Sequence, residues 1–286
     1  MKIFIKKIIL LISILLLSQG FANAVVRYHC EADSVAAIQL LEKISGIPDI
    51  GTRVMEAALA LQNVPAGEAA DNDLSGTLVV RLDTLSMREL LNVSLAAAIA
   101  AAKTNPGLRD FEKALESVSR KKGQDNGFTS QFFYASDWIV DNVYRGNVKE
   151  MTEYLENGNY KTKTLDFMTR HRDEFPALQD SATYENVKVI EMGFRSHRVP
   201  HLKKHYVGNK PFRDMLQDGD IIIMLPPETD FDIFDMGIIH IKNNEPYLIH
   251  ISKDHGKVVE DPYPLARRFK LDNQFFYGFR WLKPTE

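Results

Sequence analysis

Residues 77–103 read TLVVRLDTLSMRELLNVSLAAAIAAAK, and they mark the centre of the expected fold. The first six of these residues, Thr77 to Leu82, form an apolar run that is typical of a buried strand. Ser86 to Lys103 is rich in alanine and leucine and is apolar on nearly all sides, so it predicts a helix buried among other elements. The remaining elements are therefore expected to pack around this helix.

Helical periodicity appears mainly in the first half of the chain, in Ser34–Ile44, Thr52–Leu61, Leu108–Ser119 and a helix that Ser136 caps and that runs to Arg145. Short β-branched or aromatic runs separated by turn residues follow, namely Val187–Met192, Asp220–Leu225, Met236–Ile241, Tyr247–Ser252, Val258–Glu260 and Phe275–Leu282. This order predicts an α+β fold in which N-terminal helices pack on a C-terminal antiparallel sheet. No linker-like stretch separates the two halves, which favours a single domain over residues 25–286.

The composition is that of an ordinary globular protein. Of 286 residues, 45% are hydrophobic and 26% are charged, and the formal net charge is -3. With 38 acidic and 35 basic residues there is no broad basic field, so we expect no nucleic-acid partner. The chain has no glycine-rich phosphate-binding loop, and we expect no cofactor.

The first 24 residues have the three parts of a secretory signal peptide. A basic segment, an apolar run and a small-x-small cleavage motif follow one another: Lys2, Lys6 and Lys7, then Ile8–Leu17, then Ala22-Asn23-Ala24. The apolar run is shorter than the roughly 20 residues that a membrane-spanning helix needs. The sequence therefore predicts a periplasmic or secreted protein with no stable membrane span after processing.

The predicted central helix begins with a capping box, Ser86-Met87-Arg88-Glu89. The Ser86 oxygen is expected to accept the Glu89 N–H, and the Glu89 carboxylate to accept the Ser86 N–H. Met87 then lies in the first turn, where the helix dipole would favour a thiolate. Methionine has no ionisable proton and cannot form an acyl intermediate.

Leu78–Met87 resembles the segment that carries the nucleophile in NlpC-type, papain-like cell-wall cysteine amidases, and more narrowly in their N-acetylmuramoyl-L-alanine amidase-like family. Other stretches resemble the same family in the same order: Ser136-Asp137-Trp138-Ile139, Asp166-Phe167-Met168, Asp218-Gly219-Asp220-Ile221-Ile222, Asp232-Ile233-Phe234-Asp235-Met236-Gly237-Ile238 and Leu248-Ile249-His250. The resemblance implies a bacterial protein with the papain-like NlpC-type fold. It also implies a peptidoglycan fragment or another peptide-like ligand as the partner.

Such enzymes use a cysteine at a helix start, a histidine on a strand, and a third polar group that orients the histidine. By resemblance these three positions are occupied here by Met87, Asp235 and His250. Two of the three roles are lost, so we expect a degenerate member that binds its ligand without cleaving it. Asp235 and His250 can still form a hydrogen-bonded pair if both face the same side of the sheet.

Two alternatives stay open. An active amidase or other hydrolase would need a non-standard nucleophile such as Ser86, although the helix cap already explains the hydroxyl of that residue. A secreted interaction or inhibitor protein would use the fold only as a surface.

Three residues are candidates for binding the ligand. Ser86 adjoins the nucleophile position, while Tyr134 and Trp138 combine an aromatic face with a polar group and could line a glycan-binding cleft. His197, His201 and His205 recur every four residues, a spacing that can bind zinc on a helix. Pro200 and basic neighbours interrupt that run, which favours a solvated loop, and we expect no metal site.

Overall fold

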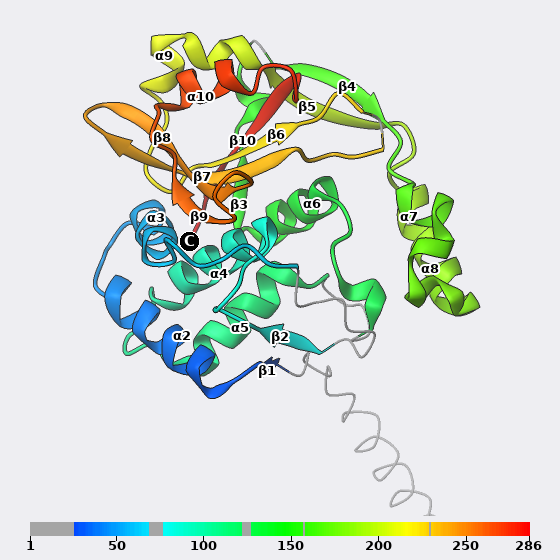
Figure 1. Cartoon of the computed structure of the whole chain (residues 1–286), viewed down its shortest axis with the longest axis horizontal. Helices are drawn as coiled ribbons and strands as arrows, with labels where there is room; N and C mark the ends of the chain where they lie inside the picture. The colour runs from blue at the N-terminus through cyan, green and yellow to red at the C-terminus, as the bar shows by residue number, and fades with distance from the viewer. Residues whose placement is uncertain (1–25, 69–76, 122–126, 157, 229) are drawn as a thin grey trace, which may run out of the picture.

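The computed structural model describes residues 26–68, 77–121, 127–156, 158–228 and 230–286. A layer of helices from the N-terminal half covers one face of a large sheet (Figure 1). The helices of this layer are α2 (Glu31–Ile44), α3 (Ile50–Ala60), α4 (Met87–Ala100), α5 (Leu108–Ser119) and α6 (Ala135–Arg145). The short β1 (Val26–Tyr28) and β2 (Leu78–Val80) pair in parallel beside them, apart from the large sheet.

The large sheet joins its strands in the order β4-β5-β10-β6-β7-β8-β9, and β3 also pairs with β10. Every pairing between these strands is antiparallel. The strands are β3 (Val148–Glu150), β4 (Asn159–Lys163), β5 (His197–Lys203), β6 (Ile221–Leu225), β7 (Asp235–Lys242), β8 (Glu245–Ser252), β9 (Lys257–Glu260) and β10 (Gly278–Pro284). The expected arrangement of N-terminal helices on an antiparallel sheet is confirmed.

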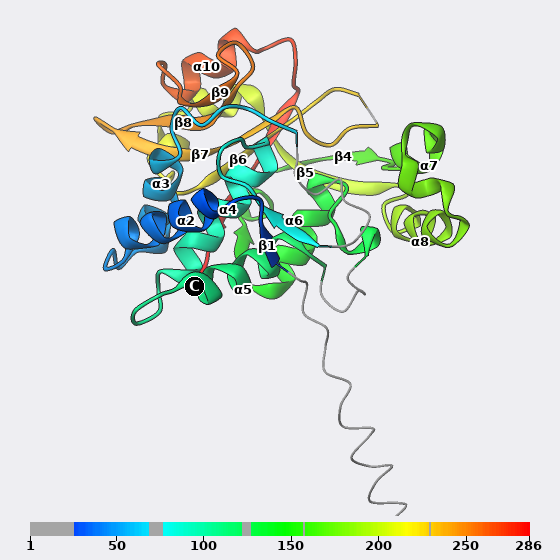
Figure 2. The same cartoon turned by 60° about the horizontal axis from the view of Figure 1, so that its bottom comes forward.

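Further short helices complete the fold (Figures 1 and 2). On the face of the sheet away from α4 lie η5 (Lys204–Gly208), α9 (Lys210–Arg213) and α10 (Leu265–Leu271). Beyond β4, at one end of the molecule, lie α7 (Phe167–Arg170), η3 (Arg172–Glu174), η4 (Pro176–Gln179) and α8 (Ser181–Met192). The short η1 (Phe128–Ser130) lies between α5 and α6, and η2 (Thr152–Tyr154) lies between β3 and β4.

The sheet has a separate hydrophobic core on each face. On β7, Met236 and Ile238 pack into the core that includes α3 and α4, whereas Ile239 packs into the core beneath α10. Leu248 of β8 lies opposite Ile239 and belongs to that second core as well. Because side chains alternate along a strand, these contacts decide which face every other residue of β7 and β8 points to.

The central helix forms as expected, and its apolar character on all sides has a structural reason. Residues of α4 from Leu90 to Ala98 are all buried, since α3 and α5 pack on the helix while the sheet covers it from above. The predicted strand before it is shorter than Thr77–Leu82 and pairs with β1 rather than joining the large sheet. The start of the chain, with the proposed signal peptide, lies outside the described residues.

Two other segments differ from the sequence predictions. Val187–Met192 was expected to be a strand, but it is the second half of α8, whose N-cap Asp180 accepts the Thr183 N–H at 2.8 Å. The basic segment that starts at His197 was expected to be a loop, but it forms β5, which pairs with β4 and β10. Within the described ranges no helix is both long and apolar enough to cross a membrane.

Candidate functional site

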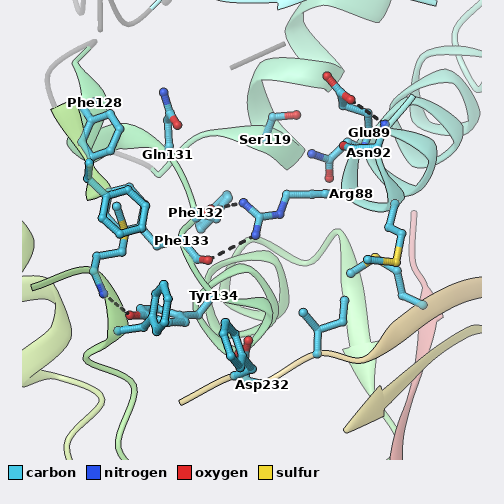
Figure 3. Close-up of a pocket in the computed structure, with 18 residues that line it drawn as sticks. Arg88, Glu89, Asn92, Ser119, Phe128, Gln131, Phe132, Phe133, Tyr134 and Asp232 are labelled. Atoms are coloured by element: carbon cyan, nitrogen blue, oxygen red, sulfur yellow. Dashed lines mark hydrogen bonds between the residues drawn. The ribbon is translucent and has the colours of Figure 1, made fainter. Parts of the chain in front are cut away.

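A pocket of about 410 Å³ opens beside the first turn of α4 (Figure 3). Its walls come from α4, from the segment that enters α6, from α7 with the turn that follows it, and from the residues that lead into β7. The lining residues are Ser86, Met87, Arg88, Glu89, Asn92, Ser119, Phe128, Gln131, Phe132, Phe133, Tyr134, Phe167, Met168, Phe175, Phe231, Asp232, Ile233 and Met236. This volume lies in the range of small-ligand sites.

The predicted capping box fixes the helix end of the pocket. Ser86 Oγ accepts the Glu89 N–H at 3.2 Å, and the Glu89 carboxylate accepts the Ser86 N–H at 2.8 Å. Met87 is the first residue of α4 and is half-buried in the pocket wall. Met236 of β7 lines the same pocket. The helix start therefore presents a thioether to the cavity, together with a second thioether from the sheet.

Aromatic rings form most of the outer wall. The Phe128 and Phe133 rings lie 5.2 Å apart, centroid to centroid. The Phe167 ring lies 4.9 Å from that of Phe231 and 6.2 Å from that of Phe175. Phe231 is 48% exposed, which places it where the wall meets solvent. The rings of this wall therefore keep apolar surface that the other described residues leave partly uncovered.

Several polar groups that line the pocket hold the protein itself together. Arg88 donates from Nη2 to the Phe133 carbonyl at 3.3 Å and from Nη1 to the Phe132 carbonyl. Asn92 Oδ1 accepts the Trp138 Nε1–H at 2.9 Å. The two oxygens of Asp232 accept the backbone N–H groups of Ala135 at 3.1 Å and Ser136 at 2.5 Å. These groups are therefore positioned by the fold and already have partners.

The contact from Asp232 corrects one sequence prediction. Ser136 was expected to cap α6, but the helix begins at Ala135, and Ser136 lies inside its first turn. The carboxylate that satisfies the first N–H groups comes from a residue 96 positions away in the sequence. A negative charge at this end of the helix is also favoured by the helix dipole.

Asp235 and His250 form a buried polar cluster on the other face of the sheet. His250 Nδ1 lies 2.9 Å from Asp235 Oδ2, so the pair that the sequence allowed if both side chains shared a face of the sheet is formed. Arg268 of α10 donates to Asp235 Oδ2 at 3.3 Å and to Asp261 Oδ2 at 3.0 Å. His250 Nε2 lies 3.8 Å from the same Asp261 oxygen. This cluster joins β7 and β8 to α10 through hydrogen bonds and ion pairs.

Met87 and the Asp235–His250 pair do not share a site. Met236, next to Asp235 in β7, faces the pocket and α4, so the Asp235 side chain points to the opposite face. His250 lies across from Gly237, in the same alternating set as Asp235. The three residues assigned to one catalytic centre are therefore divided between two faces of the sheet, and the expected pocket with all three on its walls is not present.

Comparison with known proteins identifies the scaffold. A family model described as AmiA-like, N-acetylmuramoyl-L-alanine amidase-like, matches residues 66–270. The chain belongs to this AmiA-like family. No curated protein matches it.

Solved structures resemble this AmiA-like protein over most of its length. An N-acetylmuramoyl-L-alanine amidase from Bacteroides uniformis superposes with a TM-score of 0.73 at 25% identity, covering 83% of this chain and 99% of the other. A putative xylanase from Bacteroides fragilis gives 0.70 at 24% identity, covering 79% and 98%. A Legionella pneumophila protein gives 0.71 at 17% identity, covering 90% and 95%. The last two resemblances show the fold alone.

The three predicted ligand-binding residues have different environments in this AmiA-like protein. Ser86 and Tyr134 line the pocket with Met87. Trp138 does not, because it is 2% exposed and packs in the core between the helices and the sheet. Its ring N–H is satisfied by Asn92. Trp138 is therefore a core residue and not a cleft wall.

Tyr134 contributes its ring to the pocket while its hydroxyl points elsewhere. The hydroxyl donates to Glu191 Oε1 at 2.6 Å, and Glu191 also accepts the Met168 N–H at 3.1 Å. Burial, followed by the hydrogen bond to Glu191, raises the pKa of Tyr134. The hydroxyl therefore remains a donor at neutral pH and joins α6 to α7 and α8.

The three histidines with four-residue spacing are divided between two elements. His197 and His201 lie on β5, where alternate residues share a face, and His205 lies in η5. Among the described residues no group of three or more His, Cys, Asp or Glu could hold a metal ion. The exposed Cys30 caps α2, where its N–H donates to Asp33 at 3.0 Å.

The aromatic wall was only partly visible in the sequence. Tyr134 was singled out as an aromatic residue and Asp166-Phe167-Met168 by resemblance, and of these residues Tyr134, Phe167 and Met168 line the pocket. Phe175 and Phe231 were missed because each is a single ring in a polar segment. No local pattern joins them, since each lies near the Phe167 ring only when the fold brings α7, the residue after η3 and the β6–β7 connection together.

Proposed function

We propose that this protein is an exported, degenerate AmiA-like protein of the papain-like NlpC type that binds a peptidoglycan fragment or another peptide-like ligand without cleaving it. The observation that carries the proposal is Met87 at the pocket end of α4. A thioether in this position cannot attack a carbonyl as a thiolate does. The site of binding is the pocket beside that helix start.

The chemistry of the pocket supports binding rather than hydrolysis. A hydrolase of this kind needs a nucleophile and a nearby base within hydrogen-bond reach. No cysteine or histidine is among the residues that line the pocket in the described part of the chain. The carboxylates of Glu89 and Asp232 are engaged by backbone N–H groups. Of the hydroxyl groups that line the pocket, Ser86 serves as the helix cap, Tyr134 donates to Glu191, and Ser119 lies at the end of α5.

Two further observations support the ligand class. The family description and the Bacteroides uniformis amidase both name N-acetylmuramoyl-L-alanine chemistry. The pocket volume of about 410 Å³ is large enough for a small ligand of this kind. The pocket is kept although a methionine, Met87, occupies the nucleophile position. This is the pattern expected of a binding protein built on an enzyme fold.

Calorimetry with an N-acetylmuramoyl-L-alanyl peptide tests this proposal. We expect binding by the wild-type protein and at least a tenfold loss of affinity in Met87→Trp, because the indole would fill the cavity. Met192→Trp is the matched control, since Met192 is 54% exposed at the end of α8 and lies outside the pocket. Equal affinity of both variants contradicts the pocket as the binding site, and no binding by the wild type removes the peptidoglycan fragment and leaves only another peptide-like ligand.

Export has its own test. Expression of the full-length chain in a bacterial host should yield a protein in the periplasm or medium whose mass corresponds to cleavage after Ala24. An uncleaved protein that remains in the cytoplasm would show that the leader assignment is wrong.

A second candidate is an amidase that uses Ser86. The position of Ser86 in the pocket wall and the family description favour it. This candidate requires product release that disappears in Ser86→Ala. Absence of product from the wild-type protein excludes it for the substrate tested.

A further inference from the structure

We infer that the α4 pocket recognises a large apolar side chain of a peptide rather than a sugar. The inference rests on the proposed binding function and narrows its ligand class. N-acetylmuramoyl-L-alanine offers hydroxyl and amide groups, and its apolar substituents are no larger than the methyl groups of its acetyl, lactyl and alanyl parts. The walls of this pocket suit a different chemistry.

The first reason is the surface that the pocket presents. Its phenylalanines are Phe128, Phe132, Phe133, Phe167, Phe175 and Phe231, and its methionines are Met87, Met168 and Met236. All of these phenylalanines except Phe132 are half-buried or exposed, so their rings keep surface that the described residues do not cover. Aromatic rings attract other rings in tilted or edge-to-face contacts, and methionine adapts to irregular apolar shapes.

The second reason is the state of the polar groups beside these rings. Asn92 Oδ1, both Asp232 oxygens and the Tyr134 hydroxyl already have protein partners. Tyr134 Oη is also 3.4 Å from the Met168 N–H. A sugar hydroxyl that donated to one of these oxygens would have to share an acceptor that the fold already uses, and burying it without a partner is unfavourable. An apolar side chain has no such loss.

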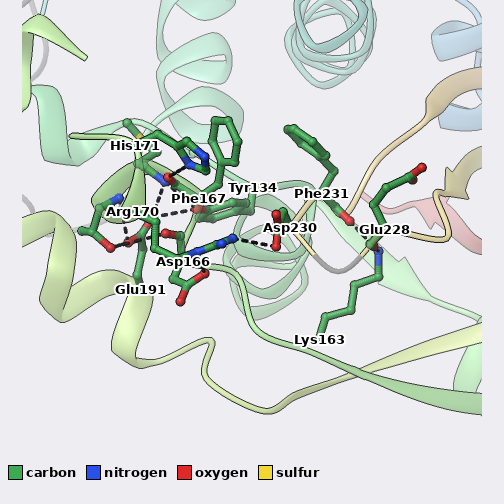
Figure 4. A network of polar contacts seen from close by, with 12 residues as sticks. Tyr134, Lys163, Asp166, Phe167, Arg170, His171, Glu191, Glu228, Asp230 and Phe231 are labelled. Atoms are coloured by element: carbon green, nitrogen blue, oxygen red, sulfur yellow. Dashed lines mark hydrogen bonds and ion pairs between the residues drawn. The ribbon is translucent and has the colours of Figure 1, made fainter. Parts of the chain in front are cut away.

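The third reason is how the outer wall is held. Arg170 pairs with Asp166 at 2.7 Å and with Asp230 at 2.6 Å, and thus joins α7 to the segment that carries Phe231 (Figure 4). These ion pairs connect the two elements whose rings, Phe167 and Phe231, lie 4.9 Å apart. The wall is therefore fastened by charged groups, and its rings remain available for a ligand.

Lys163 reinforces the same wall from the sheet. Its side chain is buried, and its ammonium donates to the carbonyl oxygens of Pro226 at 3.0 Å, Glu228 at 2.7 Å and Phe231. Glu191 holds the other side by accepting the N–H groups of Met168 and Thr169 at the start of α7. Both sides of the aromatic wall are thus positioned before a ligand arrives, which lowers the entropy lost on binding.

Three probes test the inference by calorimetry: N-acetyl-Ala-Phe-Phe-Lys-amide, N-acetyl-Ala-Ala-Ala-Lys-amide and an N-acetylmuramoyl-L-alanyl peptide. We expect the phenylalanine peptide to bind at least tenfold more tightly than the alanine peptide, with a negative heat-capacity change. Phe231→Ala should weaken that binding on the order of fivefold. The matched control is Phe275→Ala, because Phe275 is 46% exposed but lies outside this pocket.

Each outcome separates the two proposals. Tight binding of the muramoyl peptide without any preference for the phenylalanine peptide overturns the inference and leaves the proposed function standing. Binding of the phenylalanine peptide alone supports the inference and removes the sugar from the proposed ligand. Equal loss of affinity in Phe231→Ala and Phe275→Ala contradicts the pocket as the site. Failure of all three probes to bind contradicts both proposals.

Discussion

Asp232 is expected to stabilise the protein by capping α6 from a distance, and its removal provides a quantitative test. Its two oxygens accept the N–H groups of Ala135 and Ser136. Because Asp232 is 2% exposed, water cannot readily replace the carboxylate in the folded protein. We therefore expect Asp232→Ala to leave two buried donors without partners.

The magnitude follows from two overlapping contributions. Loss of an N-cap costs about 0.5–2 kcal/mol, and a buried donor left unsatisfied costs about 1–3 kcal/mol. Because the cap value already contains part of the second effect, we expect Asp232→Ala to lower the free energy of unfolding by about 2–3 kcal/mol. Ser136→Ala should cost less than about 1 kcal/mol, because no side-chain cap comes from Ser136.

Urea denaturation followed by circular dichroism measures both values, with linear extrapolation to water. Asp232→Asn should fall between wild type and Asp232→Ala, since it keeps one acceptor oxygen but turns an amide N–H toward the helix. A Ser136→Ala variant that is destabilised as much as Asp232→Ala would refute this reasoning. So would an Asp232→Ala variant within about 0.5 kcal/mol of wild type, since a lost cap alone costs at least that much.

Three further predictions concern pH, catalysis and the pocket wall. Burial raises the pKa of Asp220 to about 7, so the folded state keeps a proton that the unfolded state loses near pH 4. The free energy of unfolding should therefore fall by on the order of 3 kcal/mol as pH rises from 4 to 7. Asp220→Asn should flatten this pH dependence in urea titrations, and an unchanged pH dependence in the variant would contradict the raised pKa. The double variant Met87→Cys with Asp235→His should release no product from an N-acetylmuramoyl-L-alanyl peptide, because Met87 lies on one side of the sheet and the Asp235 side chain points to the other. Measurable product release would show that this geometry is wrong. Arg170→Gln should change stability by less than about 1 kcal/mol but weaken binding of the phenylalanine peptide several-fold, whereas Lys188→Gln, an equally exposed ion-pair variant on α8, should change neither. Equal affinities of Arg170→Gln and Lys188→Gln for the phenylalanine peptide would contradict a role of Arg170 in positioning the aromatic wall.

The sequence predicted elements whose signals are local. The capping box at Ser86 appears where the sequence placed it, because it needs only neighbouring residues. The alternating strands from Ile221 onward were also recognised, since their apolar runs are bounded by turn residues. Here propensity and tertiary packing act in the same direction.

The second half of α8 was misread because β-branched residues do not by themselves determine a strand. Val187 is buried, yet Val189 is 67% exposed, so the apolar run covers both the buried and the outer side of a helix. The cap at Asp180 and the cluster under Val187 outweigh the strand propensity. β5 was missed for the opposite reason, because Pro200 and several basic residues obscured a strand that buries Val199.

The candidate site could be predicted only in part. The contact between Asp235 and His250 follows from two adjacent strands in the expected register. The face to which that pair points depends on the packing of α10, with Arg268, on one side of the sheet and α4 on the other. A shift of one residue in the strand register moves every side chain of that strand to the other face of the sheet, and the sequence contains no signal that fixes this register.

The proposed loss of amidase activity is tested most directly by measuring product release. The wild-type protein and Ser86→Ala are incubated with a saturating N-acetylmuramoyl-L-alanyl peptide, and released peptide is quantified by mass spectrometry over many hours. We expect no release above the protein-free control in either sample, whether or not the muramoyl peptide occupies the pocket. Product that accumulates with the wild type and is absent with Ser86→Ala would show that this scaffold still cleaves amides.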